Sequence, residues 1–139
     1  MRKGQPVIPA VCAAKMDRYD PLALNVLGNP LEVCSLDPLT GWFKNGCCET
    51  EGHDRGMHIV CAHMTDAFLA HQLNGGNDLI TPRPEYGFLG LKAGDHWCVC
   101  LTRWKDALDD GVAPPIRLAA THEEALAVVP LAILQKYAA

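Results

Sequence analysis

The chain has 139 residues, of which 49% are hydrophobic and 20% are charged, as is usual for one globular domain. Its net charge of −4 and its scattered Lys and Arg residues argue against nucleic acid as a partner and favour small molecules, metal ions or other proteins. No apolar run reaches the ~20 residues that span a membrane. The composition is unusual mainly in its seven cysteines and six histidines.

The N-terminal segment has little hydrophobic periodicity. We expect residues 1–24 to form a poorly structured extension, and residues 25–139 to form a single domain. The apolar run 7–14 is a poor signal-peptide core, because Pro9 interrupts it. We therefore expect a cytoplasmic protein whose cysteines stay reduced and serve metal binding, redox chemistry or core packing rather than disulfides. Cys12 is expected to matter neither for metal binding nor for stability.

The clearest predicted strand–helix unit lies mid-chain. Residues 57–64 alternate in a pattern that predicts a strand. Thr65 is a typical N-cap for a helix over residues 66–73, and Asn74 with the two glycines that follow it is a typical end. Along this strand Cys61 and His63 share a face, whereas His58 leaves the other face unless a bulge intervenes.

Further strand–helix units are predicted in the second half of the chain. Thr121 and Glu124 have the spacing of a capping box, with Thr121 as the cap residue. The fold class is therefore predicted to be α+β: a small sheet with about three strand–helix units, helices on one side and long irregular loops. The remaining predicted elements are strands over residues 96–102 and 116–120 and helices over residues 104–110, 122–128 and 131–137.

The segment 77–95 is long and irregular, since its prolines and glycines exclude a regular helix or a central strand. Loops of this length in a compact domain are usually functional, although a solvated connector is the alternative. Arg83 lies between two prolines, so we expect a carboxylate, phosphate or sulfate near its guanidinium. The residues predicted to line a ligand pocket are Asp78, Arg83, Glu85 and Asp95.

Several long motifs resemble a known family. They are GCCET, DRGMHIVCAHMTDAFL, GNDLITPRPEYGFLGLKAGDHWCVC and APPIRLAATHEEAL. In these motifs the chain resembles an uncharacterised, mainly bacterial family known only as a domain of unknown function. The resemblance covers most of residues 25–134 and implies a shared fold, but it carries no activity. The chemistry of the site must therefore come from the residues themselves.

The cysteines suggest a metal site. Cys98 and Cys100 lie two residues apart on a predicted strand, so both thiols leave the same face. Cys61 occupies a similar place in another predicted strand, and three converging thiolates would suit a soft or borderline metal. Zinc is the first choice and iron the second, and plain burial of the cysteines is the alternative. The candidate ligands are Cys48, Cys61, Cys98, Cys100 and His58.

Two other functions are compatible with the same residues. In a metal-free thiol enzyme or redox protein, Cys47 or Cys48 would be the reactive thiol and His58 its partner, near Arg83. Asp54 or Glu85 would orient the histidine. In a protein-binding module, an aromatic surface would form the contact, made by Trp42, Phe43 and Tyr86.

Overall fold

The computed structural model of the chain describes residues 11–12 and 23–139. The predicted extension, residues 1–24, therefore lies mostly outside the described residues. Within the described ranges, the structure has one two-stranded sheet, three α-helices and three short 3-10 helices. In chain order the elements are β1 (His58–His63), α1 (Asp66–Asn74), η1 (Pro84–Tyr86), β2 (His96–Cys100), α2 (Leu101–Asp109), η2 (Leu118–Ala120), η3 (Glu123–Ala127) and α3 (Leu131–Lys136).

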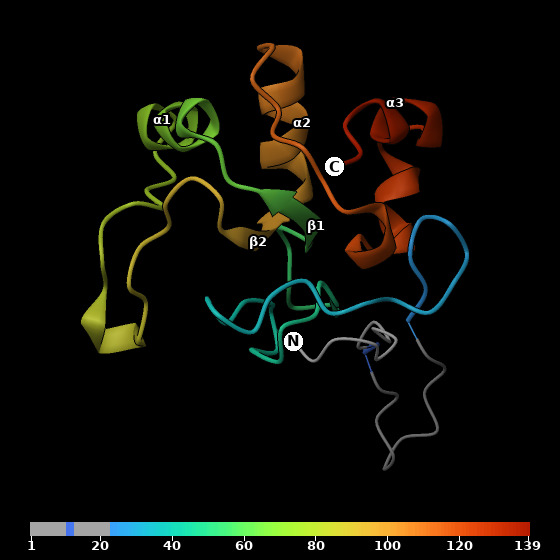
Figure 1. Ribbon diagram of the computed structural model, residues 1–139, viewed down its shortest axis with the longest axis horizontal. Helices are drawn as coiled ribbons and strands as arrows, with labels where there is room; N and C mark the ends of the chain where they lie inside the picture. Colours follow the sequence, from blue (N-terminus) through green and yellow to red (C-terminus); the bar gives the residue numbers. More distant parts are fainter. Residues whose placement is uncertain (1–10, 13–22) are drawn as a thin grey trace, which may run out of the picture.

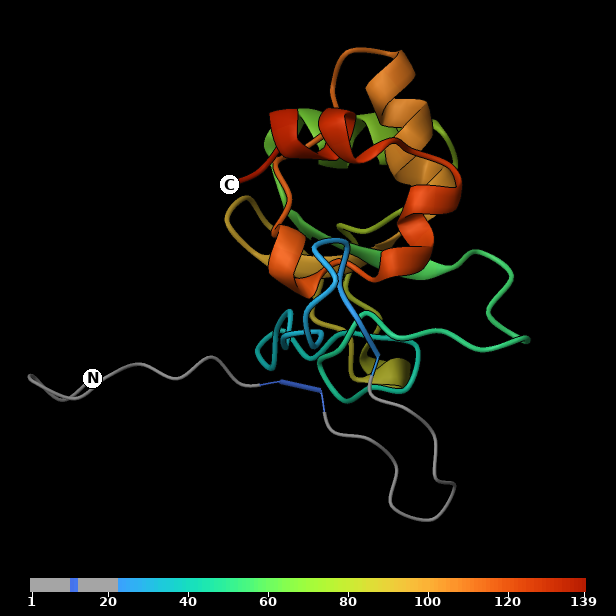
Figure 2. The same ribbon diagram turned by 90° about the vertical axis from the view of Figure 1, so that its right-hand side faces the viewer.

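The predicted α+β class is confirmed. Figure 1 shows α1, α2 and α3 on one side of the two strands and the loops of residues 31–57 on the other, and Figure 2 shows the same division from a second direction. The third predicted strand is wrong, because Ile116 forms only isolated bridges to Ala62 and Ala138. Pro114 and Pro115 precede it, and prolines without N–H groups cannot extend a ladder.

The two strands pair antiparallel, and their register places the residues that matter later. His58 lies opposite Cys100, and Cys61 lies opposite Cys98, with an irregularity between His58 and Val60. An extra residue in one strand re-aims the side chains next to it. The bulge that the sequence left open is therefore present, and it brings His58 beside the end of β2.

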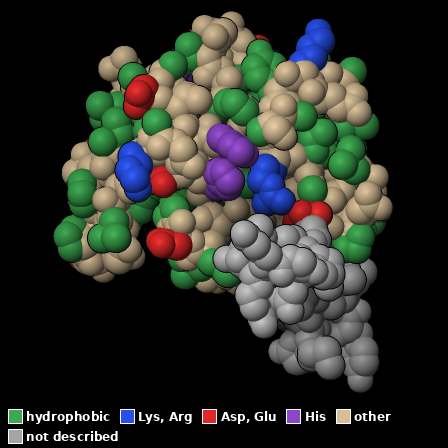
Figure 3. All heavy atoms as spheres, viewed as in Figure 1, with side chains coloured by type: hydrophobic (Ala, Val, Ile, Leu, Met, Phe, Trp, Pro, Cys, Tyr) green, Lys and Arg blue, Asp and Glu red, His purple; other side chains and the backbone are tan. Residues whose placement is uncertain are grey.

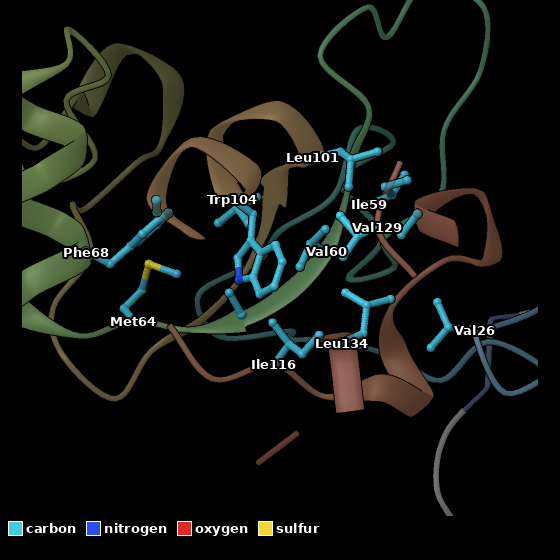
Figure 4. Packing of buried hydrophobic residues seen from close by; sticks show 14 of the residues in the cluster. Val26, Ile59, Val60, Met64, Phe68, Leu101, Trp104, Ile116, Val129 and Leu134 are labelled. Carbon is cyan, nitrogen blue, oxygen red and sulfur yellow. The ribbon is translucent and has the colours of Figure 1, made fainter. Parts of the chain in front are cut away.

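The main hydrophobic core lies between the sheet and the helices, with side chains from α1, β1, α2 and α3 around Trp104 (Figure 4). Helix α2 buries Leu101, Trp104 and Ala107, which recur every three residues and so share one face. Trp104 is completely buried, its Nε1 donates to the carbonyl of Pro114 at 3.2 Å, and its ring meets Tyr137 edge-on. This packing fixes α2, and with it the thiol that precedes the helix.

Two buried threonines satisfy the backbone of the sheet. Thr121 Oγ1 accepts from the N–H of Cys61 at 3.2 Å and donates to the carbonyl of Arg117 at 2.8 Å. Thr40 Oγ1 accepts from the N–H of Cys98 at 2.9 Å. The predicted capping box is therefore wrong. Thr121 faces the core, and the short helix η3 is capped instead by the Nδ1 atom of His122.

Candidate functional site

Six of the seven cysteines form disulfides, so the expectation of reduced cysteines is wrong for all but Cys100. Folding brings the paired residues to Cα–Cα distances of 5.3 to 6.1 Å, which suit a disulfide. Spacing along the chain could not reveal this, because each pair joins distant segments. The pairs are Cys12–Cys47, Cys34–Cys61 and Cys48–Cys98.

Two of these disulfides lie against each other in a small second core. The sulfurs of Cys34, Cys48 and Cys61 all lie within 4.8 Å of one another, and Cys98 is bonded to Cys48. The predicted convergence of Cys48, Cys61 and Cys98 is thus present, but as disulfides, and Cys100 lies outside the cluster. Sequence reasoning missed Cys34, which lies in a loop without a motif.

The disulfides also change the choice of reactive thiol. Cys47 and Cys48 are both bonded, so neither offers the free thiol predicted for it. All seven cysteines lie within the described residues, and Cys100 alone is unpaired. Its Sγ donates to the carbonyl of Gly56 at 2.8 Å and lies 3.1 Å from the hydroxyl of Thr102. The free thiol therefore lies at the junction of β2 and α2.

His58 is held in one orientation by a buried carboxylate. Its Nδ1 lies 2.6 Å from Oδ1 of Asp54, and its backbone N–H donates to Oδ2 of the same carboxylate at 2.9 Å. The Asp54 side chain is fully buried, whereas 41% of the His58 side chain is exposed. On the structure's own contacts, Asp54 and not Glu85 orients this histidine. Because Asp54 occupies Nδ1, Nε2 is the nitrogen left for a reactant.

Cys100 and His58 approach each other across Gly56. A methyl group at Gly56 would lie 3.1 Å from Cε1 of His58 and 3.2 Å from Sγ of Cys100. The imidazole and the thiol are therefore separated by no more than the sum of these distances. Any side chain at Gly56 would crowd both groups, so glycine permits their approach.

The backbone around this pair is unusual. Met57, immediately before His58, has a φ of 51°, and Lys44 has a φ of 56°. Residues other than glycine rarely adopt this conformation, and such positions cluster at functional sites. The ring of Trp42 lies nearly parallel to that of His58, with 6.2 Å between centroids. Backbone geometry and ring packing together fix the direction of the imidazole.

His58 and Cys100 open into the same cavity, which has a volume of about 620 Å³, within the usual range for small-molecule sites. Of the four residues predicted to line a pocket, Asp78 and Arg83 do so. Glu85 does not, and Asp95 instead accepts from Lys92. The aromatic residues predicted to bind a protein partner are divided: Trp42 and Tyr86 belong to the cavity wall, and Phe43 does not.

The comparison with known families agrees with the resemblance in the motifs. A family model described as "Uncharacterized protein conserved in bacteria (DUF2237)" matches residues 24–138. The chain belongs to the DUF2237 family. The curated proteins compared with this DUF2237 chain gave no match. Among the helices of the described residues, none is long and apolar enough to cross a membrane.

A second pair of histidines in this DUF2237 chain lies away from the cavity walls. The rings of His63 and His96 are 4.0 Å apart, and Nε2 of His63 is buried without a hydrogen-bond partner in the described structure. Burial lowers the pKa of His63, and the nearby positive charges of His96 and Arg117 lower it further. Figure 3 shows histidine side chains gathered near the middle of one face, with Lys or Arg side chains to either side.

Proposed function

We propose that the protein is a thiol-dependent enzyme that forms a covalent acyl intermediate on Cys100. A single observation carries the proposal: the one free thiol of the chain opens into the same cavity as His58, whose other ring nitrogen is held by the buried carboxylate of Asp54. A nucleophile, a base and a group that orients the base are the parts of a cysteine–histidine–aspartate site. The metal-free thiol enzyme that the sequence allowed therefore gains support, with a different cysteine.

The proposed reaction starts with the exchange of one hydrogen bond. The thiol leaves the carbonyl of Gly56 and gives its proton to Nε2 of His58, and the resulting thiolate attacks a carbonyl carbon of the substrate. The carbon–leaving-group bond breaks, the leaving group takes the proton from the imidazolium, and a thioester remains on Cys100. Water activated by His58 then hydrolyses the thioester and restores the thiol.

The local structure favours negative charge on sulfur during this step. Cys100 is the N-cap residue of the nine-residue helix α2, and the N-terminus of a helix stabilises a nearby anion. Asp54 supports the opposite charge, since its carboxylate lies against the imidazole that becomes positive. Gly56 keeps the two groups free of an intervening side chain. Thiolate and imidazolium would thus each have a stabilising neighbour.

The test is acylation by p-nitrophenyl acetate, followed by p-nitrophenolate release and the intact mass of the protein. Wild-type protein is expected to gain one acetyl group on Cys100, and Cys100→Ser should gain none as a thioester. His58→Gln should slow acylation by about 10²-fold, the usual contribution of general base catalysis. His53→Gln is the matched control, because His53 lies in the neighbouring loop with its side chain 90% exposed.

Two results would contradict the proposal. One is acetylation that is no slower in His58→Gln than in His53→Gln. The other is acetylation of lysines with Cys100 left unmodified. Near-ultraviolet circular dichroism of each variant shows whether the tertiary structure is retained. Asp54→Asn adds a second test of the base, because an amide at this place no longer stabilises the imidazolium.

A second candidate function is metal binding, and the cluster of sulfurs favours it. Three sulfurs lie within 4.8 Å of one another in a buried core, and Cys98 adds a fourth. Reduction of the two disulfides would give four thiolates, the usual ligand set of structural zinc, with iron as the second choice. Cys100 and His58 would not be ligands, since they belong to the cavity. The ligands would come from Cys34, Cys48, Cys61 and Cys98.

The two candidates require different conditions. Disulfides are typical of oxidising compartments, whereas a four-thiolate site requires reducing conditions such as those of the predicted cytoplasmic location. Elemental analysis of protein prepared anaerobically with a thiol reductant tests the metal candidate. Near-stoichiometric zinc that is lost in Cys61→Ser but retained in Cys100→Ser would support it. Protein that carries no zinc under these conditions would remove it and leave the thiol enzyme unaffected.

A further inference from the structure

We infer that the substrate of the Cys100 site is an anion, an acyl compound that also carries a carboxylate or phosphate group. This inference rests on the proposed function, because it takes Cys100 as the reacting group. It comes from the cations of the cavity. Lys44, Arg83 and Arg103 all line it, and none of the ion pairs within the described residues involves any of them.

The lack of ion pairs is a property of this cavity rather than of the whole surface. Elsewhere Lys92, Lys105 and Arg117 each lie within 4.0 Å of a carboxylate. Cations with paired charges offer little to a ligand, whereas unpaired ones attract and orient an anion. The cavity thus gathers positive charge that the described carboxylates do not neutralise by direct contact.

Each of the three cations is placed by its own element. Arg83 precedes η1 in the long loop, where its backbone pairs with that of Phe88. Lys44 lies in the loop facing it, with Nζ 5.9 Å from the centre of the Trp97 ring. Arg103 lies on α2 and donates to the carbonyl of Gly75 at 3.2 Å. It also borders a second, acidic hollow, so Arg83 and Lys44 carry most of the inference.

One carboxylate in the cavity wall reduces this positive charge without cancelling it. Hydrogen bonds from Thr81 lower the pKa of Asp78, as do the N–H of Ile80 and the charge of Arg83, so this side chain is ionised. Its Oδ1 already accepts from the N–H groups of Ile80 and Thr81. Three cations therefore face a single carboxylate that is engaged with its own loop, and positive charge is in excess.

The remaining wall describes the rest of the substrate. Phe88 and Trp97 lie with ring centroids 5.5 Å apart, and both line the cavity. Aromatic walls favour a flat or apolar group. The class that fits is a small acyl compound with an apolar body, whose carbonyl lies at Cys100 and whose anionic group lies at Arg83 and Lys44.

The test compares two alkylating agents that differ in charge. Iodoacetate is an anion and iodoacetamide is neutral, and with either the thiolate forms a sulfur–carbon bond as iodide leaves. The ratio of their rates at Cys100 is compared with the ratio for N-acetylcysteine in the same buffer. We expect the protein to favour iodoacetate by at least about threefold more than N-acetylcysteine, the effect of one unit charge at about 6 Å in water.

Variants assign the preference to the cavity. Arg83→Gln should lower the ratio by about threefold, and added salt should lower it in the wild type. Lys136→Gln removes the same charge from the exposed end of α3, and it should leave the ratio unchanged. A reactive Cys100 with the ratio of N-acetylcysteine would overturn this inference and leave the proposed function standing. A Cys100 that reacts with neither agent in folded protein would overturn both.

Discussion

Replacement of Thr121 by Val should destabilise the protein by about 2 kcal/mol. The side chain is completely buried, and its hydroxyl accepts from the N–H of Cys61 while donating to the carbonyl of Arg117. That carbonyl also accepts from the N–H of Ala120, so the group that loses its partner is the N–H of Cys61. A buried donor without a partner costs ~1–3 kcal/mol, whereas loss of an N-cap costs ~1 kcal/mol.

The assay is urea unfolding of the disulfide-bonded protein, followed by the fluorescence of its three tryptophans. Thr121→Ser is the matched control, since it keeps the hydroxyl and loses only a methyl group, worth ~0.8 kcal/mol. Val should therefore be clearly less stable than Ser at this position. If Thr121→Val unfolds within about 0.5 kcal/mol of the wild type, a value typical of surface substitutions, the hydroxyl does not support β1, and this account of the sheet is wrong.

Three further predictions concern the glycine, the buried histidine and the N-terminal disulfide. Gly56→Ala places a methyl group between the imidazole and the free thiol, so acylation of Cys100 should fall by about tenfold or more in the p-nitrophenyl acetate assay. The pKa of His63 is lowered in the folded protein, so below about pH 6.5 the unfolded chain binds more protons, and stability should fall as the pH falls; urea midpoints against pH should show a flatter slope in His63→Gln. The double change of Cys12 and Cys47 to Ser opens a loop with a sequence separation of 35 and should lower the unfolding free energy by ~3–4 kcal/mol, whereas equal midpoints would restore the expectation that Cys12 is dispensable.

Local sequence signals predicted much of the fold. Thr65 caps α1 as expected, with its side chain accepting from the N–H of Phe68, and α1 ends beside the predicted glycines. These features depend on neighbours a few residues apart, which a sequence displays directly. The failure at Thr121 has the opposite cause. Its partner Cys61 is 60 residues away, so a capping pattern and a buried bridge look the same in the sequence.

The candidate site was predictable only in part, for the same reason. The sequence indicated His58 and Asp54, four residues apart, because a carboxylate that close can reach the imidazole. It could not choose among seven cysteines, since their pairing depends on contacts between segments 27 to 50 residues apart. The bulge that turns His58 towards Cys100 depends on strand pairing, and it was foreseen only as a condition.

The central claim is that Cys100 is the one free thiol of the folded chain and that His58 activates it. The most direct measurement is native alkylation by iodoacetamide without reductant, followed by intact mass and peptide mapping, in the wild type and in His58→Gln. The account predicts one adduct, on Cys100, that forms at least about tenfold more slowly in the variant. Adducts on several cysteines, or one adduct at equal rates in both proteins, would contradict it.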